Sequence, residues 1–117
     1  MTLNTREIGD VTVVDVTGRI TVQEGWEQFR DLTRTLQNDG RMKLVLNLQQ
    51  VPYIDSTALG EIIRTYTSVI RHNGSVKLLH VNAHVHQLLV ITSLLSVFDL
   101  FDSEADAVKS FGKATAQ

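Results

Sequence analysis

The apolar residues of this chain change their spacing several times, and that alternation restricts the possible folds more than any other feature. Short runs rich in β-branched residues predict strands, whereas apolar residues at every third or fourth position predict helices. The predicted strands span residues 3–8, 11–16, 44–48, 76–81 and 97–101, the last as a short edge strand. The predicted helices begin after Thr21, at Thr57, at His84 and near residue 102. This order predicts an α/β fold in which right-handed crossovers connect parallel strands.

The residues between these segments support the same assignment. Gly9-Asp10 suits a two-residue hairpin turn, so the chain is predicted to open with an antiparallel hairpin. Thr21 and Glu24 have the spacing of a capping box, which predicts that Thr21 caps the first helix. We therefore expect a mixed sheet of four to five strands, with an N-terminal hairpin and about four helices.

Length and composition limit the number of domains and the class of protein. A chain of 117 residues, 43% of them hydrophobic, fits a single domain, here residues 1–117 with a core of about residues 3–112. A net charge of −2 with scattered Lys and Arg does not favour nucleic-acid binding. The apolar stretch Leu88 to Leu95 is too short to span a bilayer, and the first residues lack the apolar segment of a secretory signal. We expect a cytoplasmic protein that does not insert into a membrane.

The junction between the third strand and the second helix carries the strongest functional signal. Asp55, Ser56 and Thr57 lie where the first turn of the helix offers free backbone N–H groups and a positive dipole end. Ligands of open α/β sheets usually bind at the carboxyl ends of the strands, where this junction lies. A hydroxyl at this position can cap the helix, act as a nucleophile or accept a phosphate.

Enzymatic and metal-binding roles have weaker support. Ser56 lacks the flanking glycines of a nucleophile elbow, because Ile54 and Ala58 occupy those positions. Nothing in the sequence directs a histidine at Ser56, and no cysteine or suitably spaced carboxylate accompanies the His-x-His pair at His84 and His86. No dinucleotide or P-loop motif is present. We expect no catalytic activity, no metal and no cofactor.

The sequence resembles the STAS domain family, and in particular its small stand-alone anti-sigma factor antagonists. The resemblance spans nearly the whole chain. The residues that carry it are Val14-Asp15-Val16-Thr17-Gly18-Arg19-Ile20, Leu44-Val45-Leu46-Asn47-Leu48 and above all Tyr53-Ile54-Asp55-Ser56-Thr57-Ala58-Leu59-Gly60. The last of these segments matches the family motif Asp-Ser-[Ser/Thr]-Gly-Leu-Gly, except that Ala58 replaces the first glycine.

The resemblance implies which residues act. In that family the serine after the aspartate is phosphorylated by a partner anti-sigma factor that is itself a serine kinase, and this serine aligns with Ser56. The implied partner-binding residues are Asp55, Thr57, Ala58, Leu59, Gly60 and Thr21. Thr21 replaces an acidic residue often found in the family, and the Ala58 methyl group is expected to face the partner.

The implied function is partner switching. The unmodified protein would bind the anti-sigma factor and free a sigma factor, phosphorylation of Ser56 would release it, and a phosphatase would reverse the modification. One alternative is a STAS scaffold in another complex, for example a lipid-transport assembly. A second alternative, a receiver-like domain with Asp55 as phosphate acceptor, lacks the acidic pair and the lysine that it requires at Thr17-Gly18 and Leu100-Phe101.

Overall fold

The structure is a computed structural model that describes residues 1–115. Its five strands are β1 (Thr2–Ile8), β2 (Val11–Thr17), β3 (Lys43–Gln50), β4 (Ser75–Leu79) and β5 (Asp99–Phe101). Its four helices are α1 (Trp26–Asn38), α2 (Ser56–Arg71), α3 (Ala83–Ile91) and α4 (Glu104–Thr115). The predicted mixed α/β architecture with an N-terminal hairpin is confirmed.

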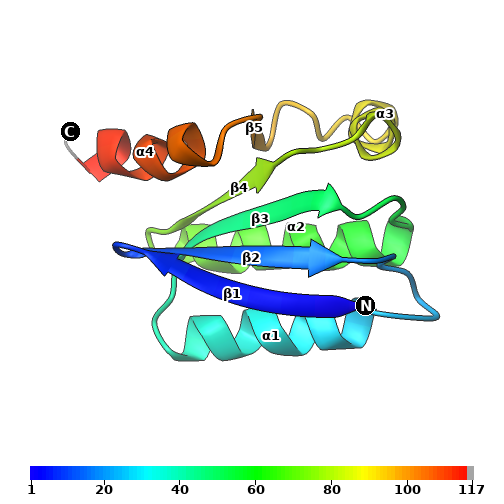
Figure 1. The fold of residues 1–117 in the computed structure, drawn as a ribbon, viewed down its shortest axis with the longest axis horizontal. Coiled ribbons are helices and arrows are strands. Elements are labelled where there is room, and N and C mark those ends of the chain that lie inside the picture. Colours follow the sequence, from blue (N-terminus) through cyan, green and yellow to red (C-terminus); the bar gives the residue numbers. More distant parts are fainter. Residues whose placement is uncertain (116–117) are drawn as a thin grey trace.

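The strands form a single sheet in the order β1-β2-β3-β4-β5. β1 and β2 pair antiparallel, and each later pair is parallel. The carboxyl ends of β2 to β5 therefore lie at the same edge of the sheet. In Figure 1 the arrows of β2 and β3 point right, toward this edge. The loops that leave this edge come from distant parts of the sequence.

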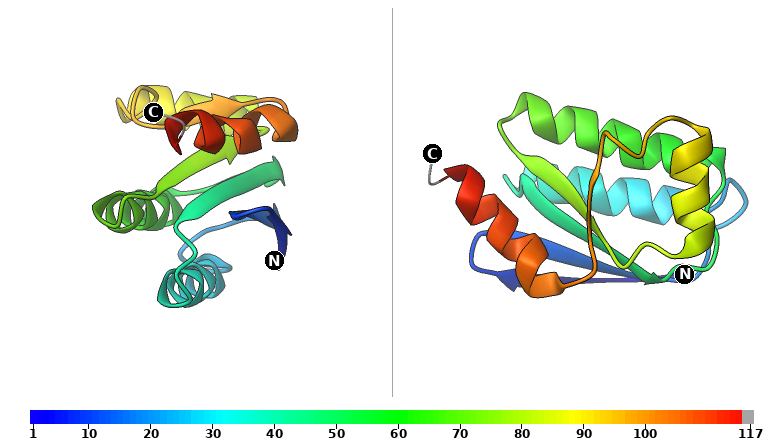
Figure 2. Two further views of the ribbon diagram at one scale, coloured as in Figure 1. Left: turned by 90° about the vertical axis from the view of Figure 1, so that its left-hand side faces the viewer. Right: turned by 90° about the horizontal axis from the view of Figure 1, so that it is seen from above.

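The helices cover both faces of the sheet. Figure 2 shows α1 and α2 side by side and α4 apart from them. One cluster of buried apolar side chains joins the sheet to α1, α2 and α3, and a smaller cluster lies under α4 around Val13, Val45 and Phe111. Within residues 1–115, no helix combines the length and apolarity needed to cross a bilayer.

The predicted start of the first helix is wrong. Residues 21–24 form a closed turn instead, in which the Thr21 N–H donates to the Glu24 carbonyl at 2.8 Å and the Glu24 N–H donates to the Thr21 carbonyl at 3.2 Å. Gly25 follows with φ of +87° in the left-handed region, and α1 begins only at Trp26, without a side-chain cap. Thr21 therefore caps no helix.

Three boundaries toward the C-terminus also differ from the prediction. β4 ends at Leu79 and not at residue 81, and His80 follows it with φ of +56° in the left-handed region. α3 ends at Ile91, two residues before Ser93 with φ of +62°, and not at Leu95. β5 begins at Asp99 and not at residue 97.

Candidate functional site

Three loops meet at the carboxyl edge of the sheet. Residues 18–25 follow β2, residues 51–55 follow β3 and residues 80–82 follow β4. The first two are joined by backbone hydrogen bonds, from the Ile20 N–H to the Tyr53 carbonyl at 3.2 Å and from the Asp55 N–H to the Ile20 carbonyl at 3.3 Å. These bonds hold the loop after β2 against the loop after β3, although Ile20 and Tyr53 are more than 30 positions apart in the sequence. Both loops therefore lie next to the start of α2.

Asp55 is the N-cap of α2. Its backbone is extended, and its Oδ1 atom accepts a hydrogen bond from the Ala58 N–H at 3.0 Å. Its Oδ2 atom accepts from the Val22 N–H at 2.8 Å, across to the loop after β2. The cap function therefore belongs to Asp55, and both carboxylate oxygens are occupied by backbone donors.

Ser56 is the first residue of α2, and its side chain is exposed. Within residues 1–115 its hydroxyl makes no hydrogen bond, either to the backbone or to a histidine. The N–H groups of Ser56 and Thr57 lie in the first helical turn, where no intrahelical acceptor exists. An exposed hydroxyl beside such donors suits a phosphate acceptor, because the donors and the helix dipole stabilise negative charge.

The other residues of the motif differ in accessibility. Asp55 and Thr57 are partly exposed, and Gly60 is exposed with open space beyond its Cα. Ala58 and Leu59, in contrast, are only 0% and 4% exposed. Neither side chain is therefore exposed on the surface, contrary to the expectation that the Ala58 methyl group lies there. Ala58 precedes Ile62 by four positions, so its methyl group points along the buried face of α2.

Thr21, which the resemblance implies as a partner-binding residue, is not exposed either. It is 8% exposed, and its Oγ1 atom accepts a hydrogen bond from the Glu24 N–H at 3.2 Å. Its side chain therefore stabilises the turn at residues 21–24. The accessible residue of this turn is its neighbour Val22.

Two exposed apolar side chains lie in the loops that adjoin the start of α2. Val22 is 55% exposed and Tyr53 is 42% exposed, and the Tyr53 ring stacks on the His84 ring with centroids 4.8 Å apart. Of the residues next to Tyr53, Pro52 is also exposed, whereas Ile54 is buried. Val22 was missed, although an apolar residue within a polar turn is a usable signal for a contact surface.

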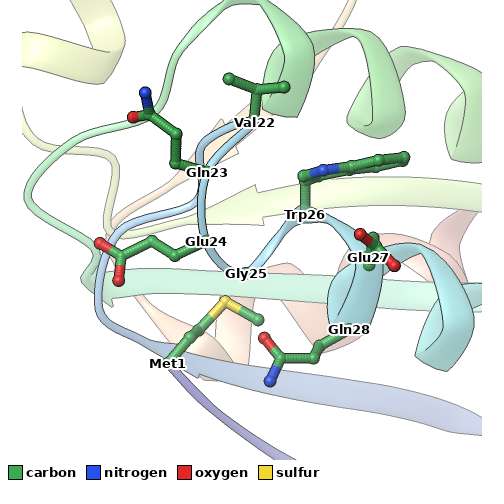
Figure 3. A pocket seen from close by; sticks show the side chains of 8 residues that line it. All are labelled: Met1, Val22, Gln23, Glu24, Gly25, Trp26, Glu27 and Gln28. Carbon is green, nitrogen blue, oxygen red and sulfur yellow. The ribbon is translucent and has the colours of Figure 1, made fainter.

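A pocket of about 410 Å³ adjoins this surface through Val22. Figure 3 shows the residues that line it, Met1 and residues 22–28. The lining includes the carboxylates Glu24 and Glu27, and no Lys or Arg belongs to it. Two acidic side chains, with no Lys or Arg side chain beside them, disfavour a phosphate-bearing ligand in this pocket.

The main charge cluster lies elsewhere, between β1, β2 and α4. Arg6 donates to Asp15 and to Glu104, each at 2.5 Å, and Asn47 donates to Asp15 at 2.8 Å. The hydrogen bond from Arg6 lowers the pKa of both carboxyl groups below their usual range. This cluster fastens α4 to the hairpin and contributes no residue to the loops around Ser56.

Comparisons with known proteins agree with this arrangement. The family model "STAS domain" matches residues 2–107. An anti-sigma F factor antagonist of Paenibacillus polymyxa is 31% identical over 65 residues, which are 56% of this chain and 56% of that protein. The chain therefore aligns with less than two thirds of the length of that relative.

Solved structures share the fold. The crystal structure of a candidate anti-sigma factor antagonist of Thermotoga maritima superimposes with a TM-score of 0.87 at 23% identity, over 92% of each chain. The Bacillus cell fate determinant SpoIIAA in its phosphorylated form superimposes with a TM-score of 0.75 at 15% identity, over 94% of this chain and 99% of that one. At these identities the likeness establishes the arrangement of strands and helices.

Proposed function

Because the chain belongs to the STAS domain family, we propose that it is an anti-sigma factor antagonist that acts by partner switching. The unmodified protein binds an anti-sigma factor that is also a serine kinase, and phosphorylation of Ser56 releases it. The observation that carries the proposal is the Ser56 hydroxyl, which is exposed at the first turn of α2 directly after the cap residue Asp55. The name of the Paenibacillus relative supports the same function.

The surface around Ser56 suits a protein partner. Val22 and Tyr53 offer exposed apolar area in the two loops next to the start of α2, and Gly60 leaves room for close approach one helical turn after Ser56. Interfaces of this kind combine apolar and aromatic contacts at the centre with a polar rim. The protein thus acts as a binding module in the cytoplasm and not as an enzyme.

A phosphate on Ser56 can be accommodated by the fold and still oppose binding. It adds about −1.5 to −2 charges at a helix N-terminus, where backbone donors and the dipole stabilise it. The same charge lies one residue from the Asp55 carboxylate, so a partner that covers both must desolvate two like charges. Release therefore follows from local charge without unfolding, and a phosphatase restores the binding form.

The test is phosphorylation by a purified kinase-type anti-sigma factor encoded in the same genome, with ATP. We expect one phosphate per chain, located on Ser56 by tandem mass spectrometry, because the Thr57 side chain is less exposed. Ser56→Ala should remain unmodified, and Thr57→Ala serves as the matched control that is still modified. A phosphate on Thr57, or full modification of Ser56→Ala, contradicts the assignment.

The same experiment separates partner switching from the scaffold alternative. A scaffold that serves another complex has no need of a kinase-type anti-sigma factor. If the parent protein neither binds that factor nor accepts a phosphate from it, the scaffold function is the better explanation of the fold.

A further inference from the structure

Two helix caps at the carboxyl edge of the sheet have the same unusual arrangement. Asp55 caps α2, and Asn82 caps α3 by accepting a hydrogen bond at Oδ1 from the Val85 N–H at 2.9 Å. Each side chain uses its second polar atom to bind the loop of the preceding parallel strand. Asp55 Oδ2 accepts from the Val22 N–H at 2.8 Å, and Asn82 Nδ2 donates to the Val51 carbonyl at 2.7 Å.

The bond from Val22 comes from a turn, residues 21–24, that within residues 1–115 makes no other hydrogen bond to the loop after β3 or to α2. Backbone pairing between this loop and the next ends at Ile20. The turn at residues 21–24 is closed by hydrogen bonds between Thr21 and Glu24, which are internal to the turn. The Asp55 carboxylate is therefore the link that fixes Val22 relative to the first turn of α2.

The bond from Asn82 has an equivalent role for the loop after β3. This loop contains Pro52, which has no N–H to donate, and the exposed Tyr53. Asn82 holds the Val51 carbonyl, and His84, one position inside the first turn of α3, stacks on the Tyr53 ring at 4.8 Å. The start of α3 thus supports Tyr53 from two points.

We propose that Asp55 and Asn82 are positioning residues that hold Val22, Tyr53 and Ser56 in one fixed surface. Asp55 acts on a partner through Val22 and through the helix start that carries Ser56. The role in partner binding rests on the function proposed above, whereas the positions of the loops are a property of the chain itself.

The chemistry of the two side chains provides selective variants. Asp55→Asn keeps an oxygen for the Ala58 N–H, and asparagine is as good a cap as aspartate, but its amide group then opposes the Val22 N–H. Asn82→Asp keeps the cap at Val85, but its carboxylate then opposes the Val51 carbonyl. Each variant therefore breaks one loop contact and spares its own helix cap.

The experiment is amide hydrogen exchange followed by NMR on the parent and both variants, without any partner. In Asp55→Asn we expect the Val22 amide to exchange about tenfold faster, with the Ala58 amide within about twofold of the parent. In Asn82→Asp the Val22 and Val85 amides should be unchanged, whereas the chemical shifts of Tyr53 and of the His84 ring should move. The two variants thus act as controls for each other.

Unchanged Val22 exchange in Asp55→Asn overturns the proposal. Equal acceleration of Val22, Ala58 and Val85 in both variants also overturns it, because that pattern is global destabilisation. A binding measurement with the kinase-type anti-sigma factor follows, and Asp55→Asn should weaken affinity about tenfold. If the parent itself does not bind that factor, the proposed function fails, but the exchange result still decides the role of the two caps.

Discussion

Substitutions at Ser56 separate two ways in which phosphorylation could act, by unfolding the start of α2 or by adding charge to an intact surface. The structure assigns the helix cap to Asp55 and leaves the Ser56 hydroxyl exposed and without a hydrogen bond within residues 1–115. Ser56→Ala therefore removes no contact. Ser56→Asp places a carboxylate at the positive end of the helix dipole, next to Asp55.

The expected stability changes follow from these contacts. Ser56→Ala should change the free energy of unfolding by less than about 0.5 kcal/mol, as for other exposed sites. In Ser56→Asp the dipole offers about 0.3–1 kcal/mol, which repulsion from Asp55 offsets, so the net change should again be small. As the positive reference, Asp55→Ala loses a cap of about 1 kcal/mol and a charge-assisted bond to Val22. Its loss of about 2 kcal/mol corresponds to a melting temperature about 10 °C lower.

The assay combines thermal melting with titration calorimetry against the kinase-type anti-sigma factor. Ser56→Ala should bind as the parent does, and Ser56→Asp should bind at least about tenfold more weakly, because its charge must be desolvated beside Asp55. Ser56→Asn is the matched control, since it has the size of aspartate without the charge. It should bind nearly as tightly as Ser56→Ala.

Two results would refute this reasoning. A loss of 1 kcal/mol or more in Ser56→Ala would mean that the hydroxyl supports the helix after all. Equal weakening by Ser56→Asn and Ser56→Asp would mean that the size of the group, and not its charge, opposes the partner.

Three further predictions concern the fold around the site. Ala58→Leu should lower the free energy of unfolding by about 1–3 kcal/mol in urea titration, because the Ala58 side chain is 0% exposed and has no room for a larger group. Thr12→Val should raise it by about 1 kcal/mol, because the buried Thr12 hydroxyl has no hydrogen-bond partner within residues 1–115. Because Arg6 lowers the pKa of Asp15 and Glu104, their stabilising contribution is present above the ordinary carboxyl pKa of about 4 and is lost as the pH falls through the lowered values. The stability difference between the parent and Arg6→Met should therefore shrink between pH 6 and pH 2, and a constant difference would contradict this account.

The order of strands and helices was predictable because it depends on local spacing of apolar residues. Val11, Val13, Val14 and Val16 form one buried strand, and Ile62, Thr65 and Val69 repeat on the buried face of α2. The same spacing predicts Ala58 in the core, because it lies four residues before Ile62. The expectation that Ala58 is exposed came instead from the family motif, in which a glycine stands at this position.

The start of α1 was not predictable from the same kind of pattern. In a capping box and in the observed turn alike, the Thr21 hydroxyl accepts from the Glu24 N–H, so the two residues fit both. The difference is made by Gly25, which takes φ of +87° and packs against Met1. A Cβ atom at Gly25 would lie 2.7 Å from the Met1 sulfur and 2.8 Å from the Arg19 carbonyl, so this conformation depends on contacts from the other end of the loop and beyond.

The choice between aspartate and asparagine at the two caps shows a similar limit. Either residue caps a helix about equally well, so helix propensity cannot explain why one stands at position 55 and the other at position 82. The neighbouring loop offers an N–H to Asp55 and a carbonyl to Asn82. An acceptor is required in the first case and a donor in the second, and only the amide supplies a donor. Because the backbone groups that make this selection lie more than 30 residues away in the sequence, the residue types follow from the parallel arrangement of the strands and not from the local motif.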